Sequence, residues 1–127
     1  MLPASSQGIL VTVKTAYLAD RSAPTLRRFA FSYTVTIANH GVEPAQLMSR
    51  HWIIIDGDGG VEEVRGEGVV GKQPMLGPGE AFEYTSWCVL PTPSGSMHGT
   101  YKMTRTDGSF FDAAIAAFAL TMPHALN

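Results

Sequence analysis

Six residues in the middle of the chain, GEGVVG from Gly66 to Gly71, match the G-x-G-x-x-G pattern that holds a pyrophosphate in dinucleotide-binding domains. In those domains a strand leads into the glycines and a helix follows, so that the N-terminus of the helix faces the phosphates. Here the segment KQPMLGPGE follows, and Pro74, Gly77 and Pro78 prevent a helix of useful length. The pattern therefore predicts an ordered crossover loop and no nucleotide site of the Rossmann type.

The same loop allows a second chemistry, in which backbone N–H groups form a concave anion site. Arg65 and Lys72 flank the loop with positive charge, although the carboxylate of Glu67 within it would repel an anion. The structural interpretation is that the glycines permit positive φ and tight packing where the chain crosses between sheets. We favour the structural interpretation and keep a candidate anion site, for a pyrophosphate or nucleotide, formed by Arg65, Gly66, Gly68, Gly71 and Lys72.

The acidic segment DGDGGVEEVRGE begins like a calcium-binding loop, with Asp56 and Asp58 at its first and third positions and Glu67 at its twelfth. Gly60 and Val61 occupy the fifth and sixth positions, where an acid or amide and then a glycine are required. The flanking segments also have the pattern of strands rather than helices. The segment therefore predicts a hairpin turn and leaves open only weak divalent-cation binding, by Asp56, Asp58, Glu62 and Glu63.

Arg50 and His51 form a secondary candidate site on the segment QLMSRHWIIID. With a period of two, Arg50 shares a face with Trp52, so an inward Trp52 implies that Arg50 also starts inward. A buried guanidinium needs a carboxylate or carbonyl groups around it, and Glu63 and Glu83 are the expected partners. A structural ion pair at the edge of the fold is favoured over a ligand-binding arginine.

The remaining titratable side chains predict neither a metal site nor a catalytic set. The four histidines lack a local ligand spacing: His40 falls in a turn, His124 in the tail, and His51 and His98 are expected to be packed or hydrogen-bonded imidazoles. The single cysteine, Cys88, is expected to be a small buried hydrophobe, because nothing near it in sequence would activate its thiol. We therefore expect no catalytic residues, no metal centre and no cofactor.

The elements that must position these residues follow a period of two. The segments ILVTVKTAYL, RFAFSYTVTIAN and QLMSRHWIIID are strands, and the third alternates less cleanly, as a central strand does. Four further segments bring the number of predicted strands to seven, although the alanines of the last would also permit a helix: VEEVR, AFEYTSWCVL, SMHGTYKMTRT and SFFDAAIAAFAL. The final two form a hairpin about Asp107 and Gly108. We predict an all-β fold, an antiparallel β-sandwich of immunoglobulin or fibronectin type III type, with a core of Phe31, Tyr33, Val35, Trp52, Ile54 and Tyr101.

Length and composition place these strands in a single domain, residues 1–127 with a core over about 9–121. A formal net charge of -2 argues against a general nucleic-acid binder, and no apolar run approaches the roughly 20 residues that span a bilayer. One cysteine excludes an intrachain disulfide and fits a reducing compartment. The segment MLPASSQGIL lacks the pattern of a signal peptide. We expect a cytoplasmic protein that binds neither nucleic acid nor membrane.

Four longer signatures, SRHW, VEEVRGEGVVGKQP, LGPGE and GSMHGTY, resemble those of the ApaG family. The resemblance runs from about Val11 to Leu120, and it departs only after FD, where alanines stand in place of the usual prolines. It implies a fibronectin type III-like sandwich in a bacterial protein, no established enzymatic activity, and a link to cobalt and magnesium efflux. Related eukaryotic domains, in F-box adaptors and in a DNA-polymerase-interacting protein, imply an interaction module.

Residues and resemblance together predict a non-enzymatic binding module. A protein partner would bind through a sheet face or an edge strand, and two copies of the chain would also contact each other. The alternative is a small-ligand protein that binds a pyrophosphate, a nucleotide or a divalent cation at the loop Gly66–Gly71. A hydrolase function is the least favoured of the three, because the sequence shows no recognisable set of catalytic residues.

Overall fold

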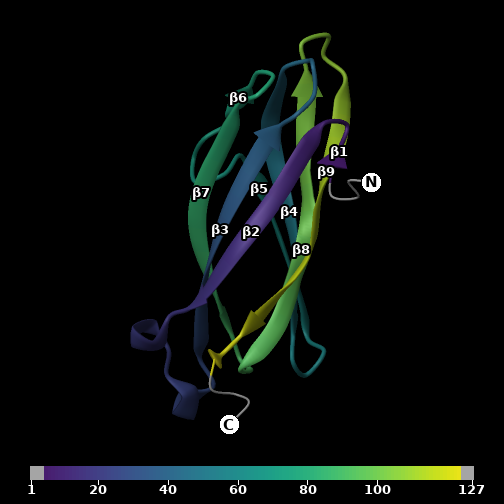
Figure 1. Cartoon of the computed structure of the whole chain (residues 1–127). Coiled ribbons are helices and arrows are strands. Elements are labelled where there is room, and N and C mark those ends of the chain that lie inside the picture. Colours follow the sequence, from purple (N-terminus) through teal and green to yellow (C-terminus); the bar gives the residue numbers. More distant parts are fainter. Residues whose placement is uncertain (1–4, 124–127) are drawn as a thin grey trace.

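Two antiparallel β-sheets pack face to face in the structure, a computed structural model that describes residues 5–123 (Figure 1). Two short 3-10 helices, η1 (Ala19–Arg21) and η2 (Pro24–Leu26), lie in one connection. His124, predicted as a tail residue, and residues 1–4 of the N-terminal segment lie outside the described range. The strands are β1 (Ser5–Ser6), β2 (Ile9–Tyr17), β3 (Phe29–Asn39), β4 (Ala45–Asp56), β5 (Val61–Glu67), β6 (Met75–Leu76), β7 (Ala81–Leu90), β8 (Ser94–Arg105) and β9 (Phe110–Thr121).

The first sheet has the order β1-β2-β3-β7, and the second has the order β5-β4-β8-β9, with β6 also paired to β4. β4 is therefore a central strand, as its irregular alternation predicts. The alanine-rich segment is strand β9 and not a helix, because it pairs with β8 in an extended conformation that turns Ala113, Ile115 and Leu120 toward the core. The predicted antiparallel sandwich is confirmed, and so is the hairpin between β8 and β9.

The core lies between the sheets and is centred on Trp52, which is 2% exposed. Alternation along β3 and β4 sends one set of side chains inward, where the rings of Tyr33 and Phe118 meet Trp52 at centroid distances of 5.4 and 5.9 Å. Tyr101 packs edge-on at 6.2 Å. All six residues predicted for the core are buried.

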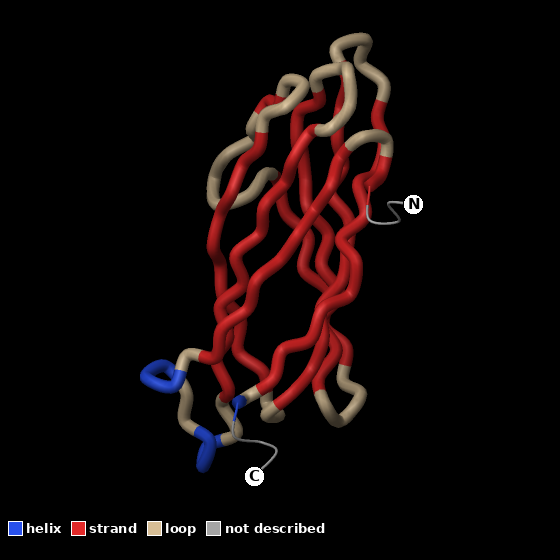
Figure 2. The backbone as a smooth tube through the Cα atoms, viewed as in Figure 1, coloured by secondary structure: helices blue, strands red, loops and turns tan. Residues whose placement is uncertain are grey.

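The sandwich has a closed side and an open side. On the closed side β2 contacts β9, and on the open side the edge strands are β7 of the first sheet and β5 of the second. Figure 2 shows both 3-10 helices at one end of the sandwich, where Arg27 on η2's C-terminal side reaches Asp58 in the β4–β5 turn at 3.0 Å. Within residues 5–123, no helix is long and apolar enough to cross a membrane.

The crossover after β5 departs from the prediction in one respect. Gly66 and Glu67 belong to β5, where they pair with Arg50 and Ser49, so placing them in a loop is wrong. The physical reason is that pairing with the long central strand continues through the glycine. The rest of the segment is an ordered connection without a helix, as predicted, and contains the unpredicted two-residue strand β6.

Candidate functional site

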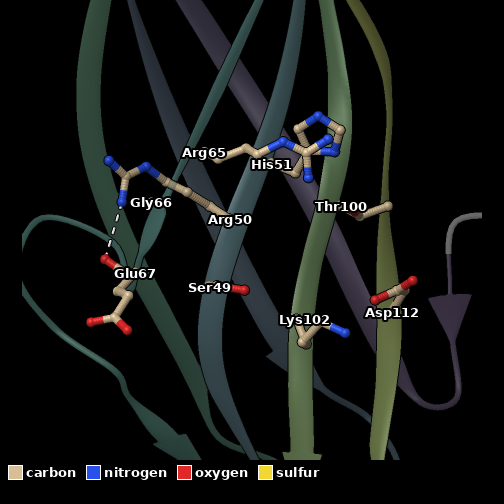
Figure 3. Close-up of a pocket in the computed structure, with 9 residues that line it drawn as sticks. All are labelled: Ser49, Arg50, His51, Arg65, Gly66, Glu67, Thr100, Lys102 and Asp112. Carbon is tan, nitrogen blue, oxygen red and sulfur yellow. Dashed lines mark hydrogen bonds between the residues drawn. The ribbon is translucent and has the colours of Figure 1, made fainter.

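A shallow hollow of about 500 Å³ lies on the outer face of the second sheet and is open to solvent (Figure 3). Most of its side chains alternate with buried residues such as Trp52 and Tyr101, so they point away from the core. The hollow is lined by Ser49, Arg50 and His51 on β4, Arg65, Gly66 and Glu67 on β5, Thr100 and Lys102 on β8, and Asp112 on β9.

Strand register arranges one group of these residues in a row across all four strands. Ser49 pairs with Glu67 on one side and with Lys102 on the other, and Lys102 pairs in turn with Asp112. The ammonium group of Lys102 also lies 5.5 Å from the ring centre of Phe110. The row therefore presents a negative, a neutral, a positive and a negative group in sequence.

A second row runs beside the first, with His51 between Arg65 and Thr100. Nε2 of His51 lies 2.8 Å from Oε1 of Glu63, and Nη2 of Arg65 donates to the same oxygen at 3.4 Å. The hydrogen bond with His51 is the main reason that the pKa of Glu63 lies below its ordinary value. The prediction that His51 is a hydrogen-bonded imidazole is confirmed.

The five residues of the predicted anion site are divided by the structure. Arg65 and Gly66 line the hollow, whereas Gly68, Gly71 and Lys72 lie in the connection beyond β5. The Arg65 guanidinium extends over the outer face toward His51 (Figure 3).

The glycine pattern itself is explained by a hairpin turn. Val69 and Lys72 exchange backbone hydrogen bonds of 2.8 and 2.9 Å, and the two residues between them, Val70 and Gly71, have φ values of 44° and 79°. Positive φ at both central positions is what two-residue hairpin turns of type I′ require. The N–H of Gly68 donates to the carbonyl of Met48, so several of the loop N–H groups already have protein acceptors. Anion binding by this loop stays a prediction.

Arg50 points inward as predicted, but the partners predicted for it are wrong. Its Nη1 donates to the carbonyl oxygen of Glu67 at 3.1 Å, as Figure 3 shows, and to that of Gly68 at 2.9 Å. Glu63 instead binds His51, and Glu83 accepts a hydrogen bond from Thr36 at 3.2 Å. The pleat explains the error, because both carboxylates occupy strand positions that face solvent rather than the space between the sheets.

The acidic segment forms the predicted turn. Oδ1 of Asp56 accepts hydrogen bonds from the N–H groups of Asp58 at 2.8 Å and Gly60 at 3.0 Å. Asp58 also pairs with Arg27. Across residues 5–123, no group of three or more histidine, cysteine, aspartate or glutamate side chains gathers in a way that could hold a metal ion.

Cys88 is half-buried, and its Sγ lies 4.0 Å from Sδ of Met97. Burial raises the pKa of the Cys88 thiol to about 11, and the negative charge of Glu62 adds to the rise. A thiol with a raised pKa is a poor nucleophile at neutral pH, which agrees with its expected role as a small hydrophobe.

Sequence reasoning missed four residues of the hollow: Ser49, Thr100, Lys102 and Asp112. One signal was available for two of them. In GTYKM, Thr100 and Lys102 alternate with the buried Tyr101 and Met103, which indicates that they lie on the outer face. The signal does not say which residues of other strands lie beside them, since that depends on strand register.

Comparison with known proteins agrees with this architecture. Residues 19–105 match the family model described as the ApaG domain. The chain is 60% identical over 127 residues to Protein ApaG of Anaeromyxobacter dehalogenans (strain 2CP-1 / ATCC BAA-258), covering 100% of both chains. It is 56% identical over 124 residues to Protein ApaG of Methylobacterium sp. (strain 4-46), covering 98% of this chain and 95% of that one.

A solved structure gives the same result. The crystal structure of a protein called ApaA from Bordetella pertussis superimposes with a TM-score of 0.89 at 52% identity, covering 91% of this chain and 94% of that chain. Family model, relatives and fold coincide over most of the sequence, and the chain belongs to the ApaG family.

Proposed function

We propose that this protein is a non-enzymatic binding module that takes a protein partner on the outer face of the second sheet. The observation that supports the proposal is the open hollow of Figure 3, where charged groups of both signs stand in rows across four strands. Small-molecule sites enclose most of their ligand, whereas an open face with alternating charge fits the complementary charges of a protein surface. We place this binding in the cytoplasm, and any effect on divalent-cation efflux would act through the partner.

Two features argue against an enzymatic role for the hollow. His51 is held by Glu63, but no serine, threonine or cysteine hydroxyl or thiol of the described chain hydrogen-bonds to it. The single thiol, Cys88, has a raised pKa. A nucleophile with an adjacent base, which covalent catalysis needs, is therefore not assembled among residues 5–123.

Site-specific photocrosslinking in a bacterium that carries this gene tests the proposal. A benzophenone amino acid replaces Thr100 in the hollow, and in a matched control it replaces exposed Thr12 on β2 of the opposite sheet. We expect a discrete crosslinked protein from position 100 only, and its loss when Lys102→Glu reverses the charge beside it. A product of two copies of this chain would identify the partner as a second copy.

The proposal is contradicted if position 100 gives no specific product, or if the product survives charge reversal and also forms from position 12. Circular dichroism of each variant confirms that the sandwich is intact.

A second candidate function is the binding of a pyrophosphate or nucleotide near the Gly66–Gly71 segment. The observation that favours it is that Arg65 and Gly66 border the hollow on one side, with Lys102 on the other. Direct titration distinguishes this function from the first.

A further inference from the structure

Arg50 places a positive charge in a narrow slot between the two sheets, on the open side between β5 and β7. Two cavities of about 200 and 130 Å³ share lining residues there; Val64 of β5 also borders the larger one, and Val69 and Val70 border the smaller one. Arg50 also borders the outer hollow, but none of the other residues that line these two cavities does. The residues that line both cavities are Tyr33, Arg50, Trp52 and Ser86.

The guanidinium of Arg50 is held in place with only part of its hydrogen-bonding capacity used. Nη1 donates to the carbonyl oxygens of Glu67 and Gly68. The group rests against Gly66, where an added Cβ would lie 2.7 Å from Cζ and from both terminal nitrogens. A guanidinium carries five N–H donors. Across residues 5–123, Arg50 donates hydrogen bonds through Nη1 alone, so the donors of Nε and Nη2 are available to a ligand.

The charge of Arg50 also lacks a counter-ion. In the described part of the chain, no carboxylate oxygen lies within 4.0 Å of its nitrogens. The charge lies near the phenol groups of Tyr33 and Tyr84 instead. Burial raises the pKa of both tyrosines, and the positive charge of Arg50 opposes that rise. A half-buried cation without an anion favours a negatively charged ligand.

We propose that this slot binds the carboxylate of a ligand through Nε and Nη2 of Arg50. The planar fork of a guanidinium matches the two oxygens of a carboxylate. Ser86, whose side chain also interacts with Tyr33, lines the slot beside Arg50. Trp52 and Val64 line it too and make part of its surface apolar. The ligand is therefore a carboxylate with a small apolar body, either a free organic acid or the C-terminus of a peptide that ends in an apolar residue.

NMR titration of the isotope-labelled chain tests the inference with two probes and their neutral counterparts. The probes are benzoate, and N-acetyl-glycyl-glycyl-valine with a free C-terminus; the counterparts are benzamide and the same peptide as its C-terminal amide. We expect saturable shifts of the Arg50 Nε–H and the Ser86 amide with the carboxylates and none with the amides. Tighter binding of benzoate would identify a free acid as the ligand class, and tighter binding of the peptide would identify a chain terminus.

Three variants separate recognition from a structural role of Arg50. Ser86→Leu fills the slot from β7, leaves the bonds from Arg50 to the backbone intact, and is expected to abolish binding. Arg50→Lys keeps the charge but loses the fork, so binding should weaken at least about tenfold. Arg65→Met removes an arginine from the outer face and should leave binding unchanged.

Retention of carboxylate binding in Ser86→Leu would overturn the inference, and so would equal binding of acids and amides. The inference would also be overturned if neither acid gave a saturable shift up to about 20 mM, because the dissociation constant would then be too high for specific recognition. Ser86 does not line the outer hollow, so the Ser86→Leu variant tests carboxylate binding in the slot without altering the surface proposed for the protein partner. A negative result for the slot therefore leaves the proposed protein interaction untouched.

Discussion

At Val70 the local backbone preference of the residue opposes the conformation that the turn imposes. Its φ of 44° lies in the left-handed region, which costs an L-residue about 1–2 kcal/mol and is least favourable for a β-branched side chain. The side chain is 57% exposed, so packing offsets little of that cost. The turn persists because Val69 and Lys72 hydrogen-bond to each other on either side of it.

Replacing Val70 with asparagine should therefore stabilise the fold, by about 1 kcal/mol, because asparagine tolerates positive φ in such turns. Urea unfolding monitored by tryptophan fluorescence measures the change. The matched control is Val61→Asn, which alters an equally exposed valine at a strand position and should give no gain. A loss of stability in Val70→Asn would mean that the valine side chain has a contact partner worth more than the backbone strain.

Single residues also show where sequence reasoning about the site succeeds and where it fails. The inward direction of Arg50 follows from its spacing to Trp52, and the structure bears it out. Its acceptors could not be predicted, because they are the backbone carbonyls of Glu67 and Gly68, and a backbone group leaves no trace in residue type. The same holds for the pairing of Lys102 with Ser49 and Asp112, which depends on strand register.

At the scale of elements, the segment between β5 and β6 is a hairpin turn, and this decides how it can meet an anion. The Rossmann arrangement needs a helix N-terminus after the glycines, and β6 follows instead. The N–H groups of Val69 and Lys72 donate to each other's carbonyls, and the N–H of Gly68 donates to the carbonyl of Met48, so these three groups are already engaged within the protein.

We therefore expect no tight nucleotide binding by this turn. Isothermal titration with NAD, ATP and pyrophosphate should give dissociation constants weaker than about 10 μM, equivalent to roughly 7 kcal/mol. Any binding that is seen should weaken with salt and be lost in an Arg65→Ala/Lys72→Ala variant, since exposed charges are screened. Affinity tighter than about 10 μM would instead make the small-ligand function the leading one.

Long strands were predictable and short ones were not. β2 and β3 carry an alternating pattern over nine or more residues, and β4 carries a less regular one over twelve. The Asp107–Gly108 turn marks the β8–β9 hairpin. β1 and β6 are two residues long, too short to show any period, and are held only by their neighbours. The 3-10 helices η1 and η2 are likewise too short for a helical pattern.

At the scale of the whole molecule, the two tryptophans report on two different environments. Trp52 lies at the centre of the core among Tyr33, Tyr101 and Phe118, whereas Trp87 is 55% exposed on β7. Trp52→Ala should lower the free energy of unfolding by about 3–5 kcal/mol, as loss of a large buried aromatic does. Trp87→Ala is the matched control and should change it by less than about 1 kcal/mol. Chemical denaturation measures both, and a loss below about 1 kcal/mol for Trp52→Ala would place its side chain outside the core.

One hydrogen bond joins the two sheets through their tyrosines. The hydroxyl of Tyr84 on β7 lies 2.5 Å from that of Tyr101 on β8, and both residues are buried. Burial raises the pKa of Tyr84 to about 12 and moves the pKa of Tyr101 still further above its ordinary value. The sandwich is therefore built around two phenols that resist ionisation while the chain is folded.

The consequence is a loss of stability in alkali. An unfolded tyrosine loses its proton near pH 10, whereas these two keep theirs in the folded state, so ionisation favours unfolding above that pH. The stabilising contribution is present in full below about pH 10 and is lost as pH rises through about 12 for Tyr84. Each tyrosine adds about 1.4 kcal/mol per pH unit to the decline in that window.

Unfolding by guanidinium chloride between pH 8 and pH 11.5 tests this expectation, with pH values chosen about the ordinary tyrosine pKa. The unmodified protein should lose stability more steeply above pH 10 than a Tyr84→Phe/Tyr101→Phe variant, and Tyr84→Phe alone should fall between them. Tyr33 and Cys88, whose pKa values burial also raises, stay in all three proteins, so the difference between the curves reports on the Tyr84–Tyr101 pair. Parallel curves for the three proteins would mean that the Tyr84–Tyr101 pair ionises as readily in the folded chain as in the unfolded one, and that the sheets are not closed over it.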